Sequence, residues 1–191
     1  MSLTAQQTKI YRIGINTFVD EIFEKDASTM QHSHDVYDLV NIIYRQLPKS
    51  LKTEVNRQNL FDAALLHDVG KIAVPDIILN KPSSLNTSEM EIVRSHAAKG
   101  KIMLAVTRFK EVADIVCFHH ERVDGNGYFH LPREQIPLES RIIAVADTYS
   151  ALTTDRVYRK KCSKDNAIRV LIEVSGTQLD ERFVEIICRS A

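Results

Sequence analysis

The stretch NRQNLFDAALLHDVGK, residues 56–71, decides the expected fold because it joins a helical apolar pattern to a His-Asp pair. Its apolar residues recur at spacings of three and four and so share one face of a helix, together with a histidine: Leu60, Ala63, Ala64 and His67. We expect this helix to end near Gly70, so that His67 and Asp68 fall in its last turn and point into a cavity.

The same helical spacing extends through most of the chain. Further helices are expected at about 32–47, 86–97, 111–120, 138–154, 164–176 and 181–189. Pro48 stops the first, an Asn86–Glu89 capping box starts the second, which has His96 in its third turn, and the third ends on two histidines. Ser163 caps the helix 164–176 and Gly176 ends it, and the last helix follows Asp180. No stretch alternates with the period of a strand, and 74–84 and 123–137 are expected to be loops. We therefore expect an all-α, multi-helix bundle.

Composition limits the class of protein. The 25 basic and 25 acidic residues balance, which argues against a binder of DNA or RNA polymers. Three scattered cysteines without CxxC spacing argue against disulfides and thiolate zinc sites, so we expect a reducing, cytoplasmic compartment and no membrane span.

The chain is expected to divide into an N-terminal helix or linker, 1–30, and one domain, 31–191. Residues 8–24 have an amphipathic helical pattern. We expect that helix to pack on the domain. The alternatives are that it pairs with a second copy in a homodimer, or that it links the domain to a signalling partner or a missing regulatory domain.

Five of the seven histidines lie near expected helix ends, beside carboxylates: His32, His67, His96, His119 and His120. Imidazole and carboxylate groups without thiolates are ligands of borderline metals, which predicts a hydrolytic or oxygen-handling centre. We interpret the other two histidines, His34 and His130, as hydrogen-bonded core residues.

The paired motifs suggest two ions rather than one. Adjacent residues on a helix point about 100° apart, so His119 and His120 are expected to serve different ions. Asp68 has two oxygens and can bridge both ions. Two ions roughly 3.5–4 Å apart commonly activate water against phosphoesters.

Five motifs carry a resemblance to a known family. They are HDVGK (67–71), VPDIILNKP (74–82), SHAAKG (95–100), HHERVDGNGY (119–128) and ESRIIAVADTYSALTTDRVYRK (139–160). In order and spacing they resemble the HD-GYP domains of the HD phosphohydrolase superfamily, from about His32 to the end of the chain. The resemblance implies an HD-domain bundle with a metal site at its centre that hydrolyses cyclic di-GMP in bacterial second-messenger signalling.

Site residues follow from the resemblance position by position. The implied metal ligands are His32, which would open its helix, His67, Asp68, His96, His119, His120 and Asp147. Asp68 and Lys71 are the implied catalytic residues, and Lys71, Arg156 and Arg159 are expected to bind the phosphates of the substrate. The cofactors would be two divalent ions, iron or manganese first, with zinc, nickel, cobalt or magnesium as alternatives.

Three departures from the family pattern concern the helices. Ser28 replaces a glutamate linked to a third ion in the family, which favours two ions. Asp35 replaces an arginine, and Ser150 replaces the second aspartate of DxxDAL.

The fourth departure is Phe129 in place of the proline of GYP, which loosens the loop. We expect Phe129 to pack against the domain rather than to stack on a guanine base. Gly125 and Gly127 are expected to allow a positive φ or a close approach of backbone. Glu121 is expected to orient a metal-binding histidine.

A metal-dependent phosphodiesterase acting on a cyclic dinucleotide is the leading hypothesis. One alternative is a catalytically weak module that binds a nucleotide or a partner protein; the reason to consider it is the altered loop that contains Gly127, Tyr128 and Phe129, called the GYF loop below. The other is a broader HD phosphohydrolase that acts on other nucleotides.

Overall fold

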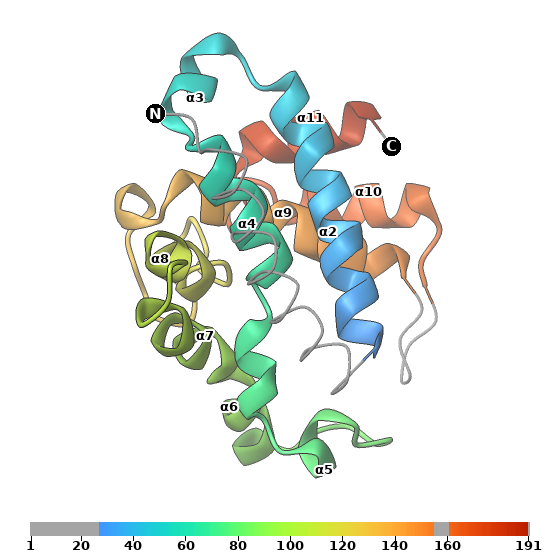
Figure 1. Cartoon of the computed structure of the whole chain (residues 1–191). Coiled ribbons are helices and arrows are strands. Elements are labelled where there is room, and N and C mark those ends of the chain that lie inside the picture. Colours follow the sequence, from blue (N-terminus) through green and yellow to red (C-terminus); the bar gives the residue numbers. More distant parts are fainter. Residues whose placement is uncertain (1–26, 155–160, 191) are drawn as a thin grey trace.

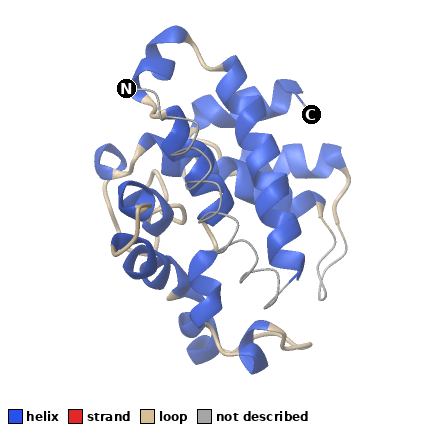
Figure 2. Cartoon of the chain, in the orientation of Figure 1, coloured by secondary structure: helices blue, strands red, loops and turns tan. Residues whose placement is uncertain are grey.

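The computed structural model describes residues 27–154 and 161–190, and all regular elements within these ranges are helices (Figure 2). The elements are α2 (Ala27–Gln46), α3 (Lys49–Glu54), α4 (Arg57–Leu66), η1 (Val69–Ala73), α5 (Asp76–Leu79), α6 (Thr87–Arg94), α7 (His96–Ala105), η2 (Lys110–Val112), α8 (Ala113–Cys117), η3 (Arg133–Gln135), α9 (Leu138–Thr153), α10 (Lys164–Glu173) and α11 (Glu181–Ser190). The expected all-α bundle is confirmed. None of the described helices is long and apolar enough to cross a bilayer.

Helix α2 packs against α4, α9 and α11, and these four helices enclose most of the core (Figure 1). Val36, Val40 and Ile43 are fully buried because spacings of four and three place them on one face. Helix α2 begins at Ala27, so the expectation that His32 opens it was wrong. Residues 27–31 continue the helix with mostly polar side chains, which gave no apolar periodicity to detect.

Helix caps follow the sequence closely. Asn86 and Glu89 form the expected capping box, and the Ser163 side chain accepts a hydrogen bond from the Asn166 N–H at the start of α10. Gly176 has a φ of 75°, which suits glycine after a helix end. The amphipathic pattern in 8–24 lies outside the described residues.

Three of the helices that carry histidines end or break earlier than expected. Helix α4 ends at Leu66 and is followed by the 3₁₀ helix η1, and α8 ends at Cys117. The expected helix 86–97 breaks at Ser95: α6 ends before this residue, and α7 begins after it and continues to Ala105, where no helix was expected. His67, His96 and His119 therefore lie at helix boundaries rather than inside helices. The expected loop 74–84 also contains one short helix, α5, at the end of the molecule away from α10 and α11 (Figure 1).

Gly70 explains how closely η1 approaches α7. A Cβ atom at Gly70 would lie 1.9 Å from the His96 carbonyl oxygen and 2.6 Å from the Gly100 nitrogen. Only a residue without a side chain fits between these backbones. The contact places the His-Asp turn directly beside the first turn of α7.

Candidate metal centre

Three buried imidazoles are fixed in the same way by their own chain. In each, Nδ1–H donates to the backbone carbonyl three residues earlier, over 2.9 Å for His67, 2.7 Å for His96 and 2.6 Å for His119. A carbonyl only accepts, so the proton is on Nδ1 and the Nε2 of the neutral ring has a free lone pair. This is the tautomer that a metal ligand needs when it binds through Nε2.

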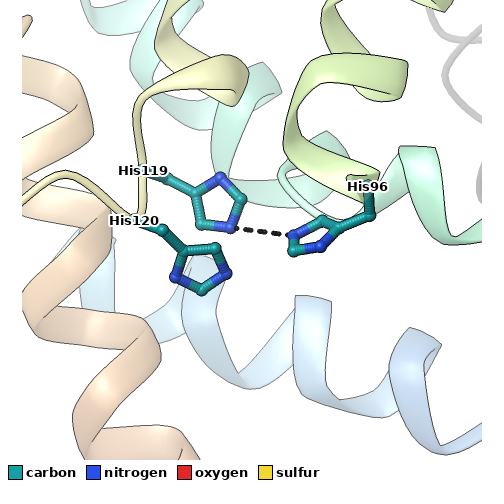
Figure 3. Close-up of side chains that lie close together, drawn as sticks. All are labelled: His96, His119 and His120. Atoms are coloured by element: carbon teal, nitrogen blue, oxygen red, sulfur yellow. Dashed lines mark hydrogen bonds between the residues drawn. The ribbon is translucent and has the colours of Figure 1, made fainter. Parts of the chain in front are cut away.

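Three histidines converge on one point (Figure 3). The Nε2 atoms of His96 and His119 lie 3.5 Å apart, and the ring centroids of His119 and His120 are separated by 3.9 Å. Each of the three offers a nitrogen within 4.8 Å of the others. Helix α8 ends at Cys117, before the pair, so the angle between neighbouring residues on a helix does not apply to His119 and His120. That the two histidines serve different ions stays a prediction.

A second group combines His32, His67 and Asp68, whose ligand atoms also lie within 4.8 Å of one another. The Nε2 of His32 lies 2.8 Å from Oδ1 of Asp147, on the neighbouring helix α9. His67 is fully buried, and its Nε2 has no hydrogen-bond partner among the described residues. A buried lone pair without a donor costs free energy, and a cation would remove that cost.

Asp68 belongs to the second group and also contacts the first. Its Oδ1 is 3.3 Å from Nε2 of His96, and its Oδ2 is 3.4 Å from Nε2 of His67. Lys71 Nζ is 2.6 Å from the same Oδ2. The two oxygens of one carboxylate therefore face the two histidine groups, as bridging between two cations requires.

Electrostatics favour a cation here. Burial lowers the pKa of His119 well below its usual value, and His120 and His67 lower it further, so the ring stays neutral. Burial would raise the pKa of Asp68, but Lys71 and His67 outweigh it and hold that pKa well below the usual range. Burial would lower the pKa of His67, but Asp68 outweighs it and raises that pKa. The site thus combines imidazoles with an ionised carboxylate, and this donor set fits divalent metal ions.

Ser150 is a site residue that the sequence showed only as a departure. It is buried on α9, one turn after Asp147, and its Oγ lies 2.9 Å from Nδ1 of His32. His32 therefore has a hydroxyl behind it, whereas the other buried imidazoles have backbone carbonyls. Neighbours of this kind orient a ligand ring and tune its basicity.

Glu121 supports the loop rather than a histidine. Its Oε1 accepts from the Phe129 N–H at 2.6 Å and its Oε2 from the Leu131 N–H at 2.8 Å. The expectation that Glu121 orients an imidazole was therefore wrong, because both oxygens are engaged by loop backbone. Gly127 allows this arrangement, since a Cβ there would lie 2.6 Å from Cα of Glu121.

The rest of the loop also follows local rules. Gly125 has the expected positive φ, 75°. Phe129 packs edge-on against Phe118, with ring centroids 5.6 Å apart, and stays 40% exposed. The Tyr128 and His120 rings are in contact, with centroids 4.7 Å apart and planes tilted by 38°, a contact that the sequence did not indicate.

The remaining sequence expectations have different outcomes. His34 and His130 are exposed, so their interpretation as core residues was wrong. His34 is on the solvent side of α2, and His130 lies within the loop 123–137, with a positive φ of 57° and a hydrogen bond of 3.2 Å between its Nδ1 and the Gly125 carbonyl. Arg156 and Arg159 lie outside the described residues.

A cavity of about 280 Å³ opens beside the centre, and its walls include His32, Asp68, Lys71, His120 and Asp147.

Residues 16–183 match the family model described as HD domain. The chain belongs to the HD domain family. The resemblance read from the five motifs is confirmed at this level, and the structure of this HD domain is the bundle described above.

Curated relatives of this HD domain are phosphodiesterases by name. The chain is 44% identical over 156 residues to a cyclic di-GMP phosphodiesterase of Pseudomonas aeruginosa, covering 79% of this chain and 36% of that protein. It is 36% identical over 171 residues to the 3'3'-cGAMP-specific phosphodiesterase 3 of Vibrio cholerae, covering 87% of this chain and 36% of that protein. The chain thus spans about a third of the length of these relatives.

Among solved structures, the fold resembles Bd1817, described as a HDG"Y"P protein from Bdellovibrio bacteriovorus. The TM-score is 0.66 at 19% identity, over 83% of this chain and 51% of that one. At this identity the likeness confirms the fold of the HD domain.

Proposed function

We propose that this HD domain is a metal-dependent phosphodiesterase that hydrolyses a cyclic dinucleotide, with cyclic di-GMP as the first candidate. The observation that carries the proposal is the Asp68 carboxylate, which faces both histidine groups and Lys71 on the wall of one cavity. The names of the curated relatives supply the substrate class.

Two divalent ions, iron or manganese, are the proposed cofactors. The ligands would be the residues of the two histidine groups with Asp147: His32, His67, Asp68, His96, His119, His120 and Asp147. When bound, such ions lower the pKa of water towards neutrality and stabilise negative charge on phosphoryl oxygens.

Lys71 and the cavity supply the remaining chemistry. The Lys71 ammonium is held at 2.6 Å by Asp68 and its side chain is 19% exposed, towards the cavity. It can therefore donate to a phosphate oxygen and stabilise charge that develops there while water adds to phosphorus and the ribose oxygen leaves. Arg156 and Arg159 are proposed to bind the other phosphate.

The test is turnover by protein purified anaerobically with iron or manganese, followed by chromatography of cyclic di-GMP. We expect a linear dinucleotide product with the wild type and loss of bound metal and turnover in Asp68→Asn. The matched control is Asp38→Asn, an exposed aspartate on α2 that should behave as wild type. Absence of turnover with a full metal complement would overturn the proposal.

A second substrate is favoured by the relatives of Vibrio cholerae named as 3'3'-cGAMP-specific phosphodiesterases, two of which are 36% identical over 87% of this chain. We therefore propose cyclic GMP-AMP as the alternative substrate of the same centre. Ratios of kcat/KM for the two nucleotides decide between them.

A further inference from the structure

Gln178 shares the cavity wall with Asp68 and Lys71, although it belongs to none of the motifs. It lies in the turn between α10 and α11, more than a hundred residues after the His-Asp pair in the sequence. Its position on this wall must therefore be secured by contacts across the chain.

Backbone hydrogen bonds hold this turn against the segment that follows the two histidines. The Val123 N–H donates to the Gln178 carbonyl at 3.3 Å, and the Asp124 N–H donates to the Thr177 carbonyl at 2.9 Å. The α10–α11 turn is thus paired with the start of the GYF loop, directly beside the metal centre.

The side chain of Gln178 is held as well. Arg122 Nη1 donates to its Oε1 at 3.3 Å. The Arg122 guanidinium is in turn fixed by Asp124, with Nε to Oδ1 at 3.0 Å and Nη2 to Oδ2 at 2.6 Å. Because arginine only donates, the amide oxygen of Gln178 must face Arg122, and the amide nitrogen takes the other side. That nitrogen has no hydrogen-bond partner among the described residues.

We propose that Gln178 is a substrate-binding residue whose Nε2–H donates to an oxygen of the bound nucleotide. The inference rests on the proposed function and extends it to a residue outside the metal centre. A neutral, pre-oriented donor complements an oxygen acceptor, which is either the carbonyl of a guanine base or a non-bridging phosphate oxygen. Asp124 and Arg122 act through Gln178 as positioning residues.

Gln178→Glu is an isosteric test. The variant keeps an oxygen for Arg122 and replaces only the donating nitrogen, so the fold and the metal ligands are left in place. We expect the KM for cyclic di-GMP to rise roughly 10- to 100-fold with kcat changed less than about 3-fold, and Gln178→Ala to raise KM roughly 3- to 10-fold. The Kd of a non-hydrolysable phosphorothioate analogue should rise in parallel, while metal content and Tm stay at wild-type values.

Gln135→Glu, an exposed glutamine in η3, is the control for the added charge and should leave KM unchanged. Cyclic di-AMP separates the two acceptors: a loss confined to guanine nucleotides identifies the base carbonyl, and an equal loss for both nucleotides identifies the phosphate. Unchanged KM and Kd in both Gln178 variants would overturn the inference. A wild type that neither binds nor hydrolyses these nucleotides would instead refute the proposed function.

Discussion

Individual residues of the centre are oriented by two kinds of neighbour. His67, His96 and His119 use carbonyls of their own chain, three residues back. His32 depends on the hydroxyl of Ser150, from a helix more than a hundred residues away in the sequence. The orientation of His32 is therefore the more sensitive to a single side-chain change.

Ser150→Ala removes the hydroxyl that lies 2.9 Å from Nδ1 of His32. We expect the affinity for manganese to fall roughly 10-fold or more, which is the usual loss of metal affinity when a hydrogen-bond partner of a metal ligand is removed. Calorimetric titration of the metal-free protein measures this change. Ser50→Ala, at an exposed serine in α3, is the matched control, and equal affinities in the two variants would contradict the role of Ser150.

Asp62 is a buried carboxyl outside the centre. Burial raises its pKa to about 7, partly offset by Arg108, and its Oδ2 has no hydrogen-bond partner among the described residues. A carboxyl whose pKa is higher in the folded than in the unfolded state stabilises the fold below the unfolded pKa, and stability falls as pH rises towards 7.

Asp62→Asn should therefore change the pH dependence of stability. Between pH 5 and pH 8 the wild type is expected to lose roughly 2 kcal/mol relative to the variant. Urea unfolding at several pH values measures the difference. Asp38→Asn should follow the wild-type curve, and parallel curves for Asp62→Asn and wild type would contradict the raised pKa.

At the scale of elements, the sequence predicted the helices better than their ends. Apolar spacing located α4, α6, α9, α10 and α11, because burial of one face decides where such helices form. It missed most of α7, which continues to Ala105 beyond the expected helix 86–97. The breaks after Leu66 and at Ser95 have no Pro or Gly signal, and they depend on packing between η1 and α7. Such long-range contacts leave no trace in a local pattern.

Gly70→Ala tests that packing. A methyl group 1.9 Å from the His96 carbonyl oxygen must push η1 and α7 apart, at a cost on the order of 3 kcal/mol, and it should displace His96 and weaken metal binding. Thermal unfolding and metal titration check both effects. Gly176→Ala, with a positive φ but open surroundings, should cost only about 1 kcal/mol and leave metal binding intact.

At the scale of the whole molecule, the proposed metal ligands come from helices and helix boundaries across the bundle, from α2 to α9. Histidine clustering and motif spacing were enough to predict the ligand set as a hypothesis. Tyr128 and Ser150, by contrast, reach the site through contacts that appear only once the helices are packed.

Bound metal should therefore stabilise the entire bundle. A divalent ion at about 100 times its Kd is expected to add roughly 2.7 kcal/mol to the free energy of unfolding for each site, provided the unfolded chain does not bind it. Thermal unfolding with manganese and with a chelator measures the difference. A Tm independent of manganese concentration would contradict a site formed by residues from several helices.

The three hydrogen bonds from Nδ1 to the preceding turn have a consequence for how this domain can vary. Because of these bonds, the orientation of each imidazole depends on the backbone three residues earlier in the same short segment. The cavity wall at Gln178, in contrast, depends on hydrogen bonds between two distant segments, 122–124 and 177–178. Under the proposed function, changes in that wall would therefore alter which nucleotide is accepted while the orientation of the imidazoles is kept.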